Sequence, residues 1–226
     1  MTLTREKIAS GYLQKMLADN PFGMKPLTLD ELDNSMAEAL KGRDLSGGVW
    51  IFAYGSLLWN PAIHLDGERD ARIHGYHRRF CLWTPLGRGS PEKPGLVLGL
   101  DRGGCCSGRA LRIAPDRVQE ELSIVWKREM VTGSYHPRWV TATTPDGPLE
   151  TLAFVMNRDR PNYAGRLSDE EVARVLAEAE GEIGPARHYL YSTVESLGKL
   201  GIHDRPIERL YRRVKELAAE ADQADE

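Results

Sequence analysis

The chain has 226 residues, of which 41% are hydrophobic and 28% charged, and its formal net charge at pH 7 is −3. This length fits one domain with an appendage or two small domains, and the composition excludes a disordered or collagen-like chain. Because 33 acidic residues offset 30 basic ones, the charge balance does not favour nucleic acid or anionic lipid as a partner.

The longest apolar stretches, 49–53 and 96–100 among them, are far shorter than the roughly 20 residues of a membrane-spanning helix. The N-terminus lacks the uninterrupted hydrophobic segment of a secretory signal. Cys105 and Cys106 are adjacent and Cys81 stands alone, which is neither a disulfide framework nor a C-x-x-C metal motif. We therefore predict a cytoplasmic protein without membrane insertion, and the sequence leaves its oligomeric state open.

Residues 1–46 are polar and carry apolar side chains at helical spacing. These side chains follow Thr28, a predicted helix N-cap with Glu31 three residues on, and are Leu29, Leu32, Met36, Ala39 and Leu40. The pair Gly47–Gly48 ends this segment, and the apolar run VWIFAYGSLLW follows. We predict a helical extension over 1–46 and a main domain over 47–226.

The middle of the main domain is rich in strand-type segments bounded by Gly, Pro or Asp. After the strand that begins at Val49, they are 72–84, 95–100, 108–113, 138–143 and 149–156. The glycine-rich stretch 101–108 is predicted to be a turn between two of them. Helices are predicted from Pro115, from Ser168 with its capping-box partner Glu171, over 185–197 and over 207–219. Strands grouped in the middle with helices inserted and following predict an α+β fold.

The usual catalytic and metal-binding side chains show no convincing motif. We expect structural roles for all six histidines, which are His64, His74, His77, His136, His188 and His203. A nucleophilic role for Cys105 or Cys106 would need a base and an oxyanion donor that spacing does not reveal. Gly103–Gly104 matches neither common phosphate-binding loop.

The stretch from Tyr54 to Ser56 follows a buried-type strand directly. Gly55 permits the backbone to turn and to aim consecutive N–H groups at one point, where a carboxylate or an oxyanion could bind. From spacing alone, we favour the simpler interpretation of a strand that ends in a tight turn, with Trp59 and Pro61 packed underneath.

Glu129 lies on the extension of an apolar helix face. Val118, Leu122 and Val125 form this face, and the same spacing reaches position 129. Burial there would raise the pKa of the carboxyl group towards neutrality, which suits a general acid–base. In the alternative interpretation the helix ends near Lys127, and Glu129 pairs with a surface cation such as its neighbour Arg128.

With these residues identified, the chain resembles the ChaC family of γ-glutamylcyclotransferases. The resemblance covers most of the main domain, and it is the combination of blocks that is specific. The blocks are WIFAYGSLLWNP (50–61), GYHRRFCLW (75–83), PGLVLGL (94–100), LSIVWKREMVTGSY (122–135), AFVMNRDRPNYAG (153–165) and GPARHYLYSTVESLGKLGIHD (184–204).

The resemblance implies a small mixed β-barrel flanked by helices, and an enzyme that converts glutathione to 5-oxoproline and cysteinylglycine. It implies neither a metal nor an organic cofactor. The family's catalytic glutamate corresponds to Glu129, in an R-E-x-x-x-G-x-Y context that keeps Gly133 and Tyr135. Its substrate-binding residues correspond to Ala53, Tyr54, Gly55, Ser56, Leu57, Leu58 and Tyr189. Ala53 stands where the family usually has glycine.

Some choices stay open at this point. Arg78 or Arg79 could pair with the glycine carboxylate of glutathione, although only one of two neighbours in a strand can face a pocket. Other γ-glutamyl dipeptides or amines are alternative substrates. A non-catalytic module linked to cation transport, and a thiol enzyme that uses Cys105 or Cys106, are alternatives from other classes.

Overall fold

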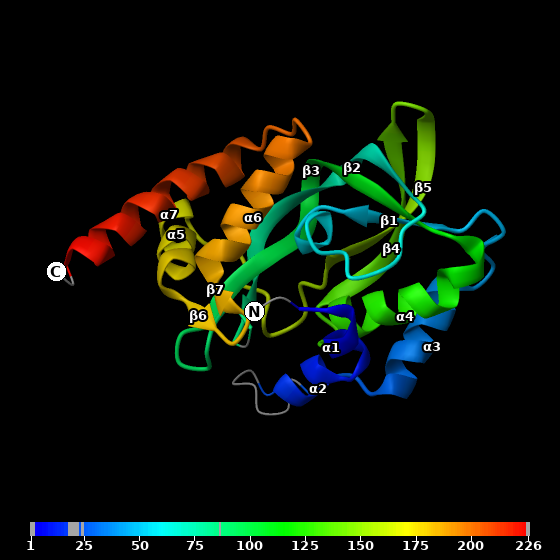
Figure 1. Cartoon of the computed structure of the whole chain (residues 1–226), viewed down its shortest axis with the longest axis horizontal. Helices are drawn as coiled ribbons and strands as arrows, with labels where there is room; N and C mark the ends of the chain where they lie inside the picture. Colours follow the sequence, from blue (N-terminus) through cyan, green and yellow to red (C-terminus); the bar gives the residue numbers. More distant parts are fainter. Residues whose placement is uncertain (1–2, 18–22, 24, 86, 225–226) are drawn as a thin grey trace.

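The computed structural model of the chain describes residues 3–17, 23, 25–85 and 87–224. Within this part, five strands close into a barrel in the order β1, β3, β2, β4, β5, and helices flank it (Figure 1). The strands are β1 (Val49–Ala53), β2 (Gly67–Thr84), β3 (Gly95–Ile113), β4 (Tyr135–Thr144) and β5 (Gly147–Met156). Strand β5 runs parallel to β1 and β3, whereas the other pairs are antiparallel. The prediction of an α+β fold with a small mixed barrel is confirmed.

Strands β2 and β3 form one long antiparallel pair that extends beyond the barrel (Figure 1). The prediction of a turn over 101–108 is wrong, because these residues continue β3. Gly103 and Gly104, at φ 102° and 70°, together face the single residue Gly75 of β2. Two residues against one is the pattern of a β-bulge, which bends a strand without ending it.

Four helices lie together against one side of the barrel (Figure 1). They are α1 (Arg5–Ala9), α2 (Tyr12–Met16), α3 (Leu29–Leu40) and α4 (Val118–Glu129), and the short 3₁₀ helix η2 (Pro115–Arg117) leads into α4. Helix α3 begins with the predicted capping box of Thr28 and Glu31 and buries Leu32 and Met36. Of the predicted extension over 1–46, residues 1–2, 18–22 and 24 lie outside the described residues.

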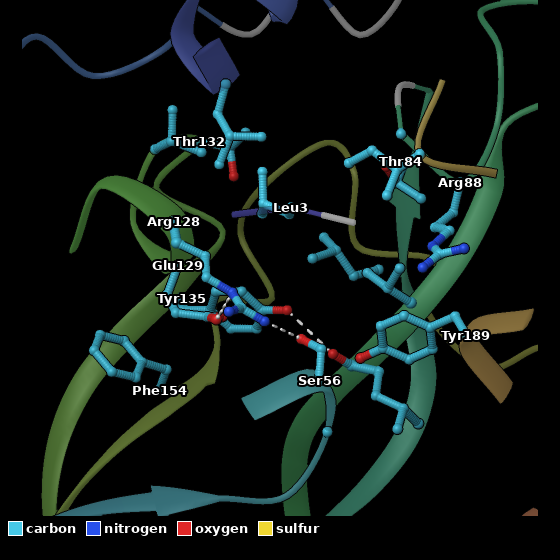
Figure 2. A pocket seen from close by; sticks show the side chains of 18 of the residues that line it. Leu3, Ser56, Thr84, Arg88, Arg128, Glu129, Thr132, Tyr135, Phe154 and Tyr189 are labelled. Atoms are coloured by element: carbon cyan, nitrogen blue, oxygen red, sulfur yellow. Dashed lines mark hydrogen bonds and ion pairs between the residues drawn. The ribbon is translucent and has the colours of Figure 1, made fainter. Parts of the chain in front are cut away.

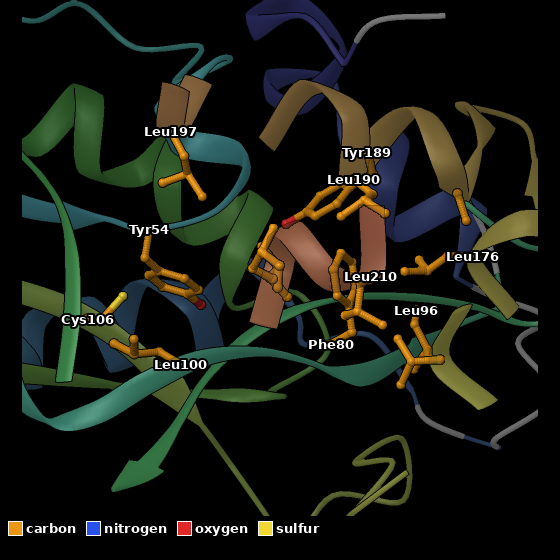
Figure 3. Packing of buried hydrophobic residues seen from close by; sticks show 14 of the residues in the cluster. Tyr54, Phe80, Leu96, Leu100, Cys106, Leu176, Tyr189, Leu190, Leu197 and Leu210 are labelled. Atoms are coloured by element: carbon orange, nitrogen blue, oxygen red, sulfur yellow. The ribbon is translucent and has the colours of Figure 1, made fainter. Parts of the chain in front are cut away.

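The C-terminal helices pack on the far part of β2 and β3. They are α5 (Asp169–Glu178), α6 (Ala186–Lys199) and α7 (Arg205–Ala224), with the two-stranded sheet of β6 (Glu180–Gly181) and β7 (Gly184–Pro185) between α5 and α6. Figure 3 shows Leu176, Leu190 and Leu210 of these helices around Phe80 and Leu96 of the strands. No helix in the described part is long and apolar enough to cross a bilayer.

Candidate active site

A cavity of about 240 Å³ lies where the end of α4, the loop after β1 and helix α6 meet. Figure 2 shows Glu129 and Arg128 on one wall, Ser56 at the base, and Tyr189 and Arg88 on the opposite wall. These five polar or charged side chains come from segments that are far apart in the sequence. Most of the remaining lining is apolar, so charges inside the cavity are screened less than charges on an open surface.

Glu129 is the last residue of α4, and its side chain is 13% exposed. Val118, Leu122 and Val125 are buried on the face that the periodicity predicted. The interpretation that placed the helix end near Lys127 and Glu129 at the surface is wrong. Its predicted partner is correct, because Arg128 pairs with Glu129 at 3.1 Å within the cavity wall. Burial raises the pKa of Glu129, and the charge of Arg128 opposes this only in part.

Arg128 ties the end of α4 to the loop after β1. Its guanidinium donates to Ser56 Oγ at 2.8 Å and to the carbonyl of Asn60 at 2.5 Å, in addition to its ion pair with Glu129. Each of its three nitrogen atoms therefore has a protein partner. This network fixes the position of the Glu129 carboxylate relative to the turn at Gly55.

The turn after β1 lies directly below the cavity, and the 3₁₀ helix η1 (Ser56–Leu58) continues it. Tyr54, Gly55, Ser56 and Leu57 line the cavity, whereas the predicted Ala53 and Leu58 are not among the described lining residues. The first N–H groups of a helix have no partner within it, so this turn can offer donors to an anion.

Gly55 and Tyr189 approach each other closely. A Cβ atom at position 55 would lie 3.0 Å from the Tyr189 hydroxyl oxygen, a tight contact that would push the tyrosine away by a few tenths of an ångström. The Tyr189 ring is held edge-on by Trp59 and Phe80, with centroids 5.8 and 6.0 Å away. The structure thus brings the predicted Tyr189 and Gly55 together at one wall.

Three tyrosine hydroxyls surround the carboxylate region. Tyr54 donates to the carbonyl of Phe154 at 3.2 Å, and Tyr135 donates to the carbonyl of Leu98 at 3.1 Å. Burial, with the nearby charge of Glu129, raises the pKa of Tyr54, Tyr135 and Tyr189. All three therefore stay neutral hydroxyls at physiological pH.

Sequence reasoning missed two contributions to the cavity. Leu3, Leu13 and Met16 of the N-terminal segment line it, and the Leu3 carbonyl accepts from Asn60 Nδ2 at 2.9 Å. Arg88, from the loop between β2 and β3, is the other missed residue. Both depend on long-range packing, for which the local sequence carries no signal.

The expected contact of Arg78 or Arg79 with a substrate carboxylate in this cavity is wrong. Arg78 is buried elsewhere, where it pairs with Asp204 at 2.9 Å and donates to the Tyr54 carbonyl at 2.9 Å. Arg79 pairs with Asp101 at 3.3 Å. Neither arginine is among the described residues that line the cavity.

The described lining residues include no cysteine or histidine. Cys105 is exposed on β3, and burial raises the pKa of Cys81 to about 12 and also raises that of Cys106. Across the described part of the chain, no group of three or more His, Cys, Asp or Glu side chains is placed to hold a metal ion. Glu129 is thus the one acidic side chain among the described lining residues.

Comparison with known proteins gives a consistent family. A family model described as ChaC-like protein matches residues 49–217. A glutathione-specific γ-glutamylcyclotransferase of Escherichia coli (strain K12) is 38% identical over 187 residues, which cover 82% of this chain and 81% of the relative. The glutathione-specific γ-glutamylcyclotransferase 1 of Mus musculus is 37% identical over 147 residues, which cover 63% of this chain and 66% of the relative. The crystal structure of a yeast γ-glutamyl cyclotransferase specific to glutathione has a TM-score of 0.70 at 22% identity, covers 75% of this chain and 96% of its own, and shows the same fold.

Proposed function

The chain belongs to the ChaC-like family, and from this premise we propose that it is a γ-glutamylcyclotransferase that converts glutathione to 5-oxoproline and cysteinylglycine. The names of the relatives from Escherichia coli and Mus musculus support glutathione as the substrate. The observation that carries the mechanism is the position of Glu129, whose buried carboxylate lies in the same cavity as the Gly55 turn.

The reaction closes a five-membered ring within the substrate. The neutral α-amine of the γ-glutamyl group attacks its own γ-carbonyl carbon, a C–N bond forms, and the bond to the cysteine nitrogen breaks. Both reacting groups share one chain, so binding the bent conformer can supply on the order of 7 kcal/mol or more of the barrier reduction. The cavity walls at Tyr189 and Gly55 fit this positioning role.

One carboxylate can serve both proton transfers. In the proposed mechanism Glu129 accepts a proton from the attacking α-amine and returns it to the departing cysteine nitrogen, so the enzyme ends as it began. A raised pKa brings the carboxyl closer to working pH, where both transfers are efficient. The ion pair with Arg128 holds the carboxylate in its orientation before the proton transfer.

Negative charge on the γ-glutamyl group needs donors. We propose that N–H groups of the turn at 54–57 donate hydrogen bonds to this negative charge. The charge is either that of the α-carboxylate or the one that develops on the γ-carbonyl oxygen in the transition state. One well-placed donor to such an oxyanion is worth roughly 3 to 4 kcal/mol. Tyr189 forms the hydrogen-bonding wall beside this turn, and Ala53 and Leu58 support the turn from outside the cavity.

We also propose that residues 1–46 are an extension added to a catalytic domain of 47–226. The family match begins at residue 49, which supports this boundary. The extension nevertheless serves the site, because Leu3, Leu13 and Met16 form part of the cavity wall.

The direct test measures 5-oxoproline release from glutathione by wild type and by Glu129→Gln. The amide cannot carry the proton, so we expect kcat to fall by at least about 100-fold, with glutathione binding retained. Glu195→Gln, at an exposed glutamate of α6 outside the cavity lining, is the matched control and should keep full activity.

The assay also separates the alternatives. Full turnover by Glu129→Gln contradicts the role of Glu129. Release from γ-glutamylalanine but not from glutathione would replace the substrate, and no release from any γ-glutamyl compound by wild type would favour a non-catalytic module.

A further inference from the structure

Arg88 is the second basic side chain among the described residues that line the cavity. Its Nη1 atom donates to the carbonyl of Pro185 at 3.2 Å, and no carboxylate pairs with it in the described part of the chain. Burial lowers the pKa of Arg88, but a guanidinium remains charged at physiological pH. A partly buried cation without an acidic partner is costly unless a ligand supplies the anion.

The backbone around Arg88 is held firmly. Gly89, Gly95 and Gly181 pack so closely that a Cβ atom at any of them would lie within 2.3 Å of neighbouring backbone. The N–H of Ile183 also donates to the carbonyl of Gly87 at 2.8 Å. Residues 87–89 of the loop between β2 and β3 are thus fixed against the β6–β7 hairpin, and Arg88 is placed before any ligand binds.

The other cation of the cavity is already occupied. Arg128 binds Glu129, Ser56 and the Asn60 carbonyl, so its charge is used to hold the proposed general base. Figure 2 shows Arg88 on the wall across from this network, with its guanidinium turned towards the cavity. An anionic group of a ligand on that side of the cavity would meet Arg88.

Glutathione carries two carboxylates at different distances from the reacting bond. Its α-carboxylate shares a carbon with the attacking amine and therefore stays near Glu129 and the Gly55 turn. Its glycine carboxylate lies at the end of the leaving dipeptide, and two extended residues span up to about 7 Å. The wall across from Glu129 suits the second carboxylate.

Resting on the proposed function, we propose that Arg88 binds the glycine carboxylate of glutathione and so selects the tripeptide over γ-glutamyl compounds without a charge at this position. A guanidinium matches a carboxylate with two parallel hydrogen bonds, which gives geometric selection as well as affinity. This assignment gives Arg88 a specificity role and leaves the chemistry to Glu129.

The test compares glutathione with its glycine monoethyl ester, in which only the charge of this carboxylate is removed. Arg88→Gln should lower kcat/KM for glutathione by about 10- to 100-fold, the range for a charge-assisted hydrogen bond. It should change kcat/KM for the ester by less than about threefold, so the preference for glutathione disappears. Arg88→Lys keeps the positive charge but cannot form two parallel hydrogen bonds, so it should retain part of the preference for glutathione over the ester. Lys93→Gln, an exposed cation of the same loop, is the control and should alter neither substrate.

Three results would overturn the assignment: equal losses for both substrates in Arg88→Gln, no loss for either, or a wild type that does not prefer glutathione. If Arg88→Gln fails to fold by circular dichroism, Arg88→Lys decides by the same comparison. The absence of 5-oxoproline from wild type with glutathione would instead contradict the proposed function. In that case, calorimetric binding of glutathione and ester to wild type and to Arg88→Gln tests Arg88 without turnover, and an equal preference in the two proteins would overturn its role.

Discussion

Glu129 connects function with stability at the level of a single side chain. Because burial raises its pKa, the folded protein holds this proton more tightly than the unfolded chain does. The stabilisation from the protonated form is complete below the ordinary glutamate pKa and is lost as the pH rises through the raised value. At neutral pH the ionised carboxylate, which the mechanism needs as a base, is therefore a cost to folding.

Replacing Glu129 with glutamine should stabilise the protein at neutral and alkaline pH, because the amide cannot ionise in the cavity. We expect a higher midpoint of thermal unfolding than wild type at about pH 8, and a difference that shrinks towards about pH 4 as wild-type Glu129 becomes protonated. Calorimetric scans of both proteins across this range measure it. A variant that is less stable than wild type at the upper end would show that the ion pair with Arg128 outweighs the burial.

At the scale of the element, local signals in the sequence predict how helices begin. Thr28 with Glu31, and Ser168 with Glu171, form the two predicted capping boxes. Helical spacing is also a local signal: it predicted the buried face of Val118, Leu122 and Val125, and it made burial of Glu129 one of two interpretations.

Features that depend on distant partners escaped prediction. Gly103–Gly104 indicates a turn when taken alone, and only its pairing with β2 makes it a bulge. Arg88 enters the cavity because a hairpin nearly a hundred residues later holds its loop. Glu121 was missed as a buried carboxylate, although its position three residues after Val118 places it near the buried face of α4.

Helix α1 is anchored to α4 by that carboxylate. Glu121 is fully buried and accepts from Arg5 of α1 and from the backbone and ring nitrogens of His64. Burial alone would raise the pKa of Glu121, but these hydrogen bonds together hold it below its ordinary value. Arg5 also pairs with Glu120 at 2.6 Å. Arg5 therefore helps to hold the N-terminal wall of the cavity, together with the hydrogen bond from Asn60 to the Leu3 carbonyl and the burial of Ile8.

Arg5→Met should release this wall. It leaves Glu121 buried without its main cation, a change that costs up to about 3 kcal/mol. We expect faster hydrogen exchange over residues 3–17 and a KM for glutathione raised by up to about tenfold. The kcat should change less, because Glu129 keeps its own contacts.

Lys41→Met is the control for that experiment, since the exposed pair of Lys41 and Glu38 contributes little. Unchanged exchange over 3–17 in Arg5→Met would mean that apolar packing, and not the ion pair, holds α1 in place. An unchanged KM despite faster hydrogen exchange would show that the N-terminal segment does not contribute to glutathione binding.

At the scale of the whole molecule, barrel closure and the C-terminal helices bring the site together. The parallel contacts of β5 with β1 and β3 close the barrel, and the turn at Gly55 then lies beside the end of α4. Helix α6 supplies Tyr189 from more than a hundred residues away, held by α5 and α7 on the outer side (Figure 3). The sequence predicts the individual strands and helices, but only the closed fold brings the Gly55 turn, the end of α4 and Tyr189 together.

Substitutions at two adjacent residues of α6 should distinguish a residue that stabilises the fold from one that takes part in the reaction. Leu190 is fully buried in the core beneath the helix, whereas its neighbour Tyr189 faces the cavity. Leu190→Ala should lower the free energy of unfolding by about 2 to 5 kcal/mol because it leaves a cavity in the core. The kcat of its folded fraction should stay near that of wild type.

Tyr189→Phe should give the opposite result, because it keeps the ring contacts with Trp59 and Phe80 and removes only the hydroxyl beside Gly55. We expect a change in unfolding free energy of about 1 kcal/mol and a loss of kcat/KM of about tenfold, the effect of one hydrogen bond to the reacting group. Denaturant unfolding and 5-oxoproline release, measured on both variants, make the comparison. Equal activity in Tyr189→Phe and wild type would make Tyr189 a core residue whose hydroxyl has no part in the reaction, and α6 would then only brace the barrel.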